Sequence, residues 1–371
     1  MLRRTNLLTV AFLFLSGTAS QATAQEIRPG VSSARQPQTL PLPTEGYDAY
    51  LVGELHGLEE NEEFELQYLK QLHSASGLRD VAIEEKAAYE EDAQAFVDGK
   101  SDRLPSALCL RAGILEGIRS FNTELNPDAR IRVHLTDIDS PAAAIRQHLA
   151  ALKERLRANE VSIPAETAIK TRGLEAAAQL KALTKDSALR SELRTVELSI
   201  LAFQQGLEVG IGPPKGSPYL DSREQAVASN IVDLLRLRGN LSLLVIYGSD
   251  HVSRTPRNDG GPARDQPFTP MALRLQQSGI RAFSIVTFPL AGRSFWRGQS
   301  NELPWTAADG HLASGETFDQ VVSAVPGTRF LYIDTKRQRA RLPADDISNM
   351  AVDAFLLFRS GTPMKNRCEA R

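Results

Sequence analysis

The chain has 371 residues, with 43 Lys or Arg against 45 Asp or Glu, which leaves a formal net charge of −2. This near balance argues against nucleic acid or another highly charged polymer as a partner. Hydrophobic residues make up 42% of the chain, enough for a large folded core. We therefore expect a globular protein, and the composition does not indicate an oligomeric state.

The first 24 residues have the layout of a secretory signal. Arg3 and Arg4 precede the apolar run Leu7–Leu15, and the small residues Ala22-Thr-Ala24 follow it. The apolar run is far shorter than the roughly 20 residues that a membrane-spanning helix needs. We predict cleavage after Ala24 and export, most simply to a bacterial periplasm, with no membrane span in the mature protein.

Residues 25–46 are rich in Pro, Ser and Gln and predict a flexible leader. Apolar, β-branched runs then alternate with the helical patterns 60–74, 89–97 and 107–125. Near-continuous apolar strands between helices are typical of a parallel sheet that is covered on both faces. We predict an α/β fold with a doubly wound, mainly parallel sheet. Its strands are expected at Ala49–Val52, Val81–Glu84, Ile131–Thr136, Leu241–Gly248, Ala282–Phe288, Phe330–Asp334 and Ala354–Phe358.

Residues 141–207 interrupt this alternation. They are rich in Ala, Leu, Lys, Arg and Glu, with apolar residues at helical spacing, and they predict two or three long helices. We expect a helical insertion beside the sheet, either over one edge of a site or only covering a face. The α/β domain then comprises residues 47–140 and 208–371. The polar stretches 206–221 and 253–267 are either functional lids or solvated loops.

Ionisable residues follow four of the predicted strands. In doubly wound sheets, ligands bind outside the carboxyl ends of the strands. A carboxylate there often caps the next helix, and a lone histidine is more often structural. Together, however, these residues predict a site for proton transfer, metal binding or both. They are Glu54 and His56, then Glu84 and Glu85, then Asp137 and Asp139, and finally Asp250 and His251.

Arg223 is a further candidate. Asp221-Ser222 predicts a helix start, which puts Arg223 in the first turn, where the helix dipole disfavours a cation. The acidic cluster would supply its partner, although a solvated arginine is the alternative. Asn230 lies two turns further along the same face. The other histidines lack such a setting and are predicted to be surface or packing residues: His73, His134, His148 and His311.

Cys109 and Cys368 are the only two cysteines, and their spacing does not suggest a metal site. In an oxidising compartment they could form a disulfide. The alternative is two unrelated thiols. We predict a catalytic role for neither.

Several short motifs together resemble the erythromycin-esterase-like, ChaN-like and Tiki-like superfamily. The opening motif Val52-Gly-Glu-Leu-His-Gly57 resembles that of this group, as do Ala82-Ile-Glu-Glu85 and the helix from Arg223 to Asn230. Val245-Ile-Tyr-Gly-Ser-Asp-His251 resembles its late strand that ends in histidine, and Val352–Phe358 its closing strand. The resemblance covers the chain from about residue 47 to residue 358 and implies the same α/β scaffold.

The resemblance also implies roles for individual residues. His56 matches the histidine proposed as general base, and His251 matches the second histidine. Glu54 and Glu84 match the acidic residues of the pocket, and Arg223 matches the arginine. The esterases usually have one more residue between the Glu and the His, so the spacing here is closer to the ChaN-like branch. The paired Gly-x-x-His pattern is similar to the metal-dependent Tiki branch.

Three hypotheses follow for the function. In the first, His56 activates water to cleave an ester, lactone or amide without a metal, and Arg223 and His251 stabilise the oxyanion. In the second, His56, His251 and either Glu54 or Glu84 bind Zn²⁺ or Mn²⁺, which activates the water. In the third, as for ChaN-like relatives, the protein binds haem for iron uptake. We favour hydrolysis that requires no cofactor, with substrate-binding residues Glu85, Asp137, Asn230 and Asp250.

Overall fold

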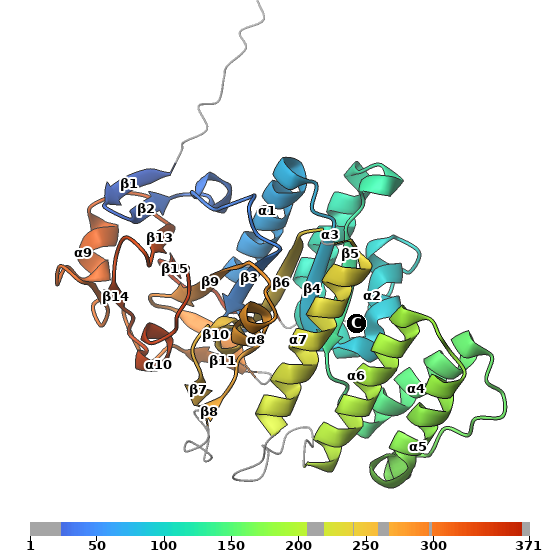
Figure 1. The fold of residues 1–371 in the computed structure, drawn as a ribbon. Coiled ribbons are helices and arrows are strands. Elements are labelled where there is room, and N and C mark those ends of the chain that lie inside the picture. Colours follow the sequence, from blue (N-terminus) through green and yellow to red (C-terminus); the bar gives the residue numbers. More distant parts are fainter. Residues whose placement is uncertain (1–23, 206–218, 240, 259–266, 297–298, 366–371) are drawn as a thin grey trace, which may run out of the picture.

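The computed structural model describes residues 24–205, 219–239, 241–258, 267–296 and 299–365. They form a large sheet with the strand order β1-β2-β13-β15-β9-β3-β6-β4-β5 (Figure 1). All seven predicted strands are present, within two residues of their predicted ends. The strands of this sheet are β1 (Gln25–Arg28), β2 (Val31–Ala34), β3 (Ala49–Glu54), β4 (Asp80–Lys86), β5 (Arg132–Asp137), β6 (Leu243–Gly248), β9 (Ala282–Pro289), β13 (Phe330–Asp334) and β15 (Ala354–Phe358).

The six neighbouring strands from β15 to β5 run parallel to one another. At the other side of the sheet, β13 pairs antiparallel with β15, and β2 pairs antiparallel with β13. Every residue of β3 and of β6 is buried, as expected for central strands of a sheet with two covered faces. The predicted mainly parallel sheet is therefore confirmed, with antiparallel strands added along one edge.

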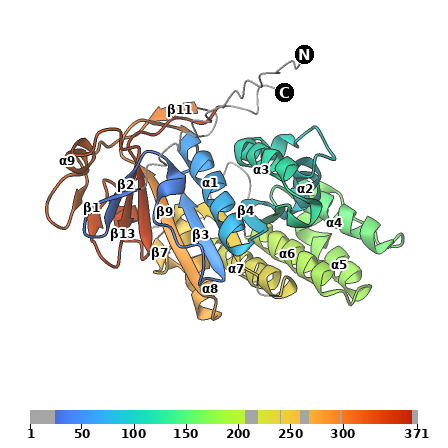
Figure 2. The same cartoon turned by 90° about the horizontal axis from the view of Figure 1, so that it is seen from above.

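Helices cover both faces of the sheet (Figures 1 and 2). Alternate residues of β3 divide between two cores: Tyr50 and Val52 belong to one, and Ala49 and Leu51 to the other. This confirms the doubly wound α/β fold. The first core contains residues of α1 (Glu59–Ser76), α2 (Glu90–Val97) and α3 (Ala112–Glu124), and the second those of α7 (Tyr219–Leu237), α8 (Met271–Gln277) and α9 (Phe318–Ser323).

The segment predicted as a flexible leader differs from that expectation. Residues 25–34 form the hairpin of β1 and β2, and β2 joins the sheet through β13. Val31 and Ala34 are buried there. Backbone hydrogen bonds to β13 order this short, serine-containing strand, which is why side-chain periodicity did not reveal it. The predicted signal peptide lies outside the described residues apart from Ala24.

Three helices occupy the predicted insertion: α4 (Ala142–Leu156), α5 (Ile169–Ala182) and α6 (Ser187–Gln204). They share a small core of their own and meet the sheet domain through α7, beside the β5 edge (Figure 1). The predicted loop 206–221 lies mostly outside the described residues, as do residues 259–266. The remaining short elements are β7 (Arg257–Asn258), β8 (Pro267–Phe268), β10 (Arg293–Trp296), β11 (Gln299–Glu302), β12 (His311–Leu312), β14 (Ala340–Arg341) and α10 (Asp345–Ser348).

The strand order creates a switch point at the centre of the sheet. β3 and β6 are neighbours, and Glu54 pairs in register with Gly248 at their carboxyl ends. The chain leaves β3 toward α1 on one face and leaves β6 toward α8 on the other. Ligands bind at such points in open α/β sheets. Within the described ranges, no helix is both long and apolar enough to cross a membrane.

Candidate active site

His56 lies on the turn that follows β3 and contacts Glu54 across that turn. Its Nδ1 atom is 2.9 Å from Oε1 of Glu54. Glu54 is buried, whereas the His56 side chain is 31% exposed. Gly57 has a φ of 87°, and a Cβ there would lie 1.8 Å from the carbonyl oxygen of Phe295, so this turn requires glycine. The turn thus presents one imidazole to solvent and anchors it to a buried carboxylate.

The charge of Glu54 is set by its neighbours. Burial alone would raise the pKa of this carboxyl group. Arg111 ion-pairs with it from the segment before α3, and His56 contacts the same oxygen. Together they outweigh burial and lower the pKa of Glu54 to about 2. Glu54 is therefore a carboxylate at neutral pH.

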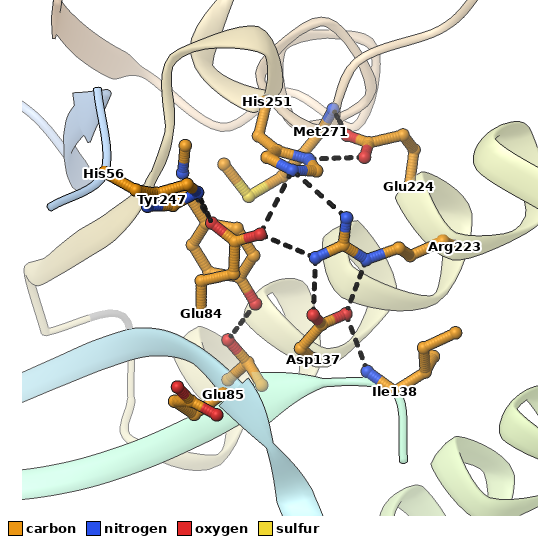
Figure 3. A network of polar contacts seen from close by, with 12 residues as sticks. His56, Glu84, Glu85, Asp137, Ile138, Arg223, Glu224, Tyr247, His251 and Met271 are labelled. Atoms are coloured by element: carbon orange, nitrogen blue, oxygen red, sulfur yellow. Dashed lines mark hydrogen bonds and ion pairs between the residues drawn. The ribbon is translucent and has the colours of Figure 1, made fainter. Parts of the chain in front are cut away.

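The structure describes α7 from Tyr219, so Arg223 lies beyond its first turn, whereas the predicted helix start at Asp221-Ser222 placed it within that turn. Arg223 binds two carboxylates at once (Figure 3). Its Nη2 atom donates to Glu84 at 2.6 Å, and its Nε atom donates to Asp137 at 2.9 Å. Asp137 also accepts the backbone N–H of Ile138 at 2.8 Å. The prediction that Arg223 finds an anionic partner at the sheet edge is confirmed, and the partners come from β4 and β5.

His251 lies on the turn after β6 and is 7% exposed. Its Nδ1 atom is 2.5 Å from Glu224, its Nε2 atom is 3.4 Å from Glu84, and Nη1 of Arg223 is 3.3 Å from Nε2 (Figure 3). Burial lowers the pKa of His251, but the two carboxylates more than offset it and raise the pKa to about 10. His251 is therefore an imidazolium cation at neutral pH.

Glu84 joins the two histidine turns. Its Oε2 atom accepts the backbone N–H of Gly248 at 2.5 Å and lies 3.7 Å from Nε2 of His56. Burial opposes its ionisation, but His251, Arg223 and His56 outweigh burial and hold its pKa well below the usual range. The predicted meeting of the two histidine turns at one sheet edge is confirmed, and Glu84 is the carboxylate between them.

The four predicted substrate-binding residues have different surroundings. We call His56, Glu84, Arg223 and His251 the cluster. Asp137 accepts hydrogen bonds from Arg223, and Glu85 lies beside the cluster, where burial raises the pKa of Glu85 (Figure 3). Asn230 is buried, donates to the carbonyl of Thr136 and accepts from Thr195, so it ties α7 to β5 and α6. Asp250 is half exposed and pairs with Arg257 on the following loop. Only Asp137 touches the Arg223 cluster among these four.

Three contributors were not predicted from the sequence. Arg111 pairs with Glu54, and the Tyr247 hydroxyl group contacts the Thr136 hydroxyl group at 2.8 Å. Glu224 pairs with His251 (Figure 3). A signal did exist for Arg111, because it is a single charge in the apolar segment 107–115. Glu224 follows Arg223 directly in a helix of mixed charge and carries no such signal.

The remaining histidines lie outside this cluster. His73 contacts the carbonyl of Ala129, and His311 contacts that of Leu312. His134 and His148 are buried and ion-paired with carboxylates, so they are interior rather than surface residues. Cys109 is not a free thiol. The other cysteine, Cys368, lies outside the described residues, and the disulfide between them stays a prediction.

The described side chains do not form a group of three or more His, Cys, Asp or Glu arranged to hold a metal ion. In the predicted set of His56, His251 and Glu54, the Nδ1 atom of His56 faces Glu54, while Nε2 of His251 faces the Arg223 guanidinium. This guanidinium also binds Glu84, so it supplies the positive charge beside the carboxylates. In the present arrangement, the set of His56, His251 and Glu54 does not fit a metal ion.

Comparison with solved structures shows which fold this is. A protein from Bacillus cereus aligns with 90% of this chain and 95% of its own, at 14% identity and a TM-score of 0.63. A succinoglycan biosynthesis protein aligns over the same shares, at 12% identity and a TM-score of 0.64. The erythromycin esterase EreC, in its open conformation, aligns with 87% of this chain and 93% of its own, at 14% identity and a TM-score of 0.58.

The chain has the erythromycin esterase-like fold. The likeness covers nearly the whole of each protein, so the fold that the sequence motifs suggested is confirmed. No family model matches the chain, and no curated protein matches it in sequence. Identities of 12–14% establish the erythromycin esterase-like fold and not an activity, because function depends on the site rather than on the fold.

Proposed function

We propose that the protein is a hydrolase that cleaves an ester, lactone or amide bond with water activated by His56. The observation that carries this proposal is the contact between His56 and Glu54 at 2.9 Å. A part-exposed imidazole whose Nδ1 faces a buried carboxylate is the arrangement of a general base and the group that orients it. The carboxylate holds the imidazole in one tautomer and stabilises the imidazolium that forms.

In the first step, the Nδ1–H of His56 donates to Glu54 and its Nε2 atom takes a proton from water. The water oxygen forms a bond to the carbonyl carbon of the substrate, and the carbonyl π electrons move to its oxygen. Arg223 and the His251 imidazolium lie at the same sheet edge and place positive charge near this oxyanion. Such preorganised charge is commonly the largest contribution to catalysis of acyl transfer.

In the second step, the oxyanion re-forms the carbonyl and the bond to the leaving oxygen or nitrogen breaks. The leaving group takes the proton from His56, which returns the neutral imidazole. The products are a carboxylic acid and an alcohol or amine, and only water is consumed. The chemistry needs no oxidant, reductant or further cofactor.

Two further features support a hydrolase in an exported setting. EreC, which has the same fold, is an erythromycin esterase. The N-terminal sequence, with Arg3 and Arg4 before an apolar run, has the layout of a secretory signal. We propose an exported, periplasmic or secreted protein whose substrate is a small molecule with an acyl bond.

A panel of esters, lactones and short peptides, incubated with the purified mature protein, tests the proposal. The matched variants are His56→Gln and His73→Gln, because His73 lies on α1 outside the cluster, where its Nε2 atom contacts the carbonyl of Ala129. We expect His56→Gln to lower kcat by about 100-fold or more, the usual size of general-base catalysis, and His73→Gln to leave it unchanged. Near-complete activity of His56→Gln would overturn the assignment of the base.

A further inference from the structure

A second acid and a single arginine lie beneath the contact between His56 and Glu54. Glu54, Glu65 and Arg111 are all buried, with exposed fractions of 3%, 1% and 9%. Glu54 comes from β3, Glu65 from α1, and Arg111 from the 3-10 turn that precedes α3. Three separate elements therefore bring charged groups to one interior point behind His56.

Arg111 and His56 share one acceptor atom. Nη1 of Arg111 donates to Oε1 of Glu54, which is the same oxygen that lies 2.9 Å from Nδ1 of His56. The position of this oxygen therefore depends on both groups. His56 is part exposed and can adjust, whereas Arg111 is buried, so the arginine is the fixed side of this arrangement.

Glu65 lies in the same buried site as Glu54 but does not ionise as readily, because Arg111 does not offset its burial. Burial and the charge of Glu54 raise the pKa of Glu65 well above its usual range, although Arg111 opposes this. One arginine beside two buried carboxyl groups thus keeps one of them ionised. The ionised one is Glu54, the partner of His56.

We propose that Arg111 is a positioning residue for the hydrolytic reaction, because it fixes the Glu54 oxygen that accepts the hydrogen bond of His56. This proposal rests on the proposed function, since it concerns the same base. Arg111 acts through Glu54 and does not touch the reacting atoms. A buried carboxylate that loses its only buried counter-ion among the described neighbours is strongly destabilised, and it relaxes by moving or by taking a proton. Either change removes the fixed acceptor of His56.

The shape of the guanidinium matters as well as its charge. Arginine presents several donors in a planar fork, whereas lysine presents one compact charge on a flexible stem. We therefore expect Arg111→Lys to restore the charge but only part of the alignment. Arg111→Met has a similar stem and removes the charge entirely.

A double-mutant cycle tests whether Arg111 works through Glu54. The variants are Arg111→Met, Glu54→Gln and the pair together, measured as kcat and KM on the best substrate of the panel. We expect Arg111→Met to lower kcat by about 10- to 100-fold with little change in KM, and Arg111→Lys to recover part of the loss. In the Glu54→Gln background, the same Arg111→Met substitution should change kcat by less than about threefold.

Arg119→Met is the matched control, because Arg119 lies on the adjacent α3 and pairs with the exposed Asp102 instead. It should leave kcat unchanged. Equal losses from Arg111→Met in both backgrounds would overturn the proposal, since Arg111 would then act independently of Glu54. So would full activity of Arg111→Met. If Arg111→Met does not fold, the same cycle is run with Arg111→Lys, which keeps the buried charge.

The two proposals fail in different ways. If His56→Gln retains full kcat, then the base assignment is wrong and the proposed function fails with it. If Glu54→Gln loses activity while Arg111→Met does not, then only the role of Arg111 is wrong.

Discussion

The Nδ1 atom of His251 lies 2.5 Å from Oε1 of Glu224, a side chain with no exposed surface. The other oxygen of Glu224 accepts the backbone N–H of Met271 at 2.6 Å, at the first residue of α8. The start of α8 thus fixes the carboxylate, and the carboxylate fixes the imidazole ring. As a result, the Nε2 atom of His251 faces Glu84 and Arg223 in the cluster.

Replacement of Glu224 by Gln is expected to weaken catalysis most at alkaline pH. The amide oxygen can still accept from Met271, but the negative charge beside His251 is lost. Burial lowers the pKa of His251, and only Glu84 of the two carboxylates would then remain to raise it. The pKa therefore falls from about 10, and the imidazolium is lost at lower pH. In a kcat profile from pH 6 to pH 10, the alkaline decline should move to lower pH.

Glu197→Gln is the control for this substitution, because Glu197 lies on α6 and pairs with Lys181 away from the cluster. Its profile should match that of the unaltered protein. An unchanged profile for Glu224→Gln would show that the charge on His251 does not contribute to the rate.

The strand ends of the site and Arg223 could be predicted from the sequence, but Glu224 and Arg111 could not. Continuous apolar runs mark buried parallel strands, and parallel strands bring their carboxyl ends to one edge, so the sequence predicts Glu84 and His251 at that edge. Glu224 and Arg111 reach the same place from α7 and from the turn before α3. Their contacts depend on how these segments pack, which local periodicity does not encode.

Glu65 shows a signal that the sequence did contain. It follows Phe64 and precedes Tyr68 and Leu69, so it occupies a core-facing position of α1. A charged residue on the apolar side of a helix needs a buried partner. By contrast, the short strand β2 gave no side-chain pattern, since backbone pairing with β13 orders it.

Gly248→Ala should reduce activity, because the added methyl group would displace the His56 imidazole. A Cβ at this position would lie 3.0 Å from Nε2 of His56 and 3.4 Å from Oε2 of Glu84. The first distance is tighter than ordinary packing, so His56 must shift. We expect kcat to fall about tenfold, with a loss of about 1–3 kcal/mol in unfolding free energy from overpacking. Steady-state kinetics and denaturant unfolding measure the two effects.

Gly173→Ala provides the comparison, because its added Cβ also lies 3.0 Å from a neighbour, the end of Ile200 in the helical insertion. That flexible methyl group can move without touching the cluster. Equal losses of kcat in the two variants would mean that the contact with His56 is not the cause.

Chelators should leave the hydrolytic rate unchanged in the favoured hypothesis. The guanidinium of Arg223 bridges Glu84 and Asp137 and already supplies positive charge beside the carboxylates. The test is kcat after treatment with a chelator, with metal content of the purified protein measured in parallel, and again after addition of Zn²⁺ or Mn²⁺. Loss of activity that either ion restores would favour the metal-dependent alternative with His56, His251 and Glu54 as ligands.

The ion pair of His148 with Asp139 should make the stability of the protein depend on pH. Their atoms Nδ1 and Oδ2 are 2.7 Å apart and buried. Burial lowers the pKa of His148, but Asp139 and Glu192 outweigh it and raise the pKa to about 10. The folded state therefore binds this proton more tightly than the unfolded state, in which the pKa is close to 6.5.

The stabilisation from this proton is fully present below about pH 6.5, decreases as the pH rises, and is lost above about pH 10. The difference in unfolding free energy between the unaltered protein and His148→Gln should therefore shrink between pH 6 and pH 10 in denaturant titrations. Leu180→Ala removes buried apolar contacts in the same helical core and no ionisable group. The unfolding free energy that it loses should therefore be similar at pH 6 and at pH 10. If the loss of unfolding free energy in His148→Gln is also the same at pH 6 and pH 10, then His148 is not held as a cation. The hydrogen bond to Asp139 alone would then tie α4 to the segment that follows β5.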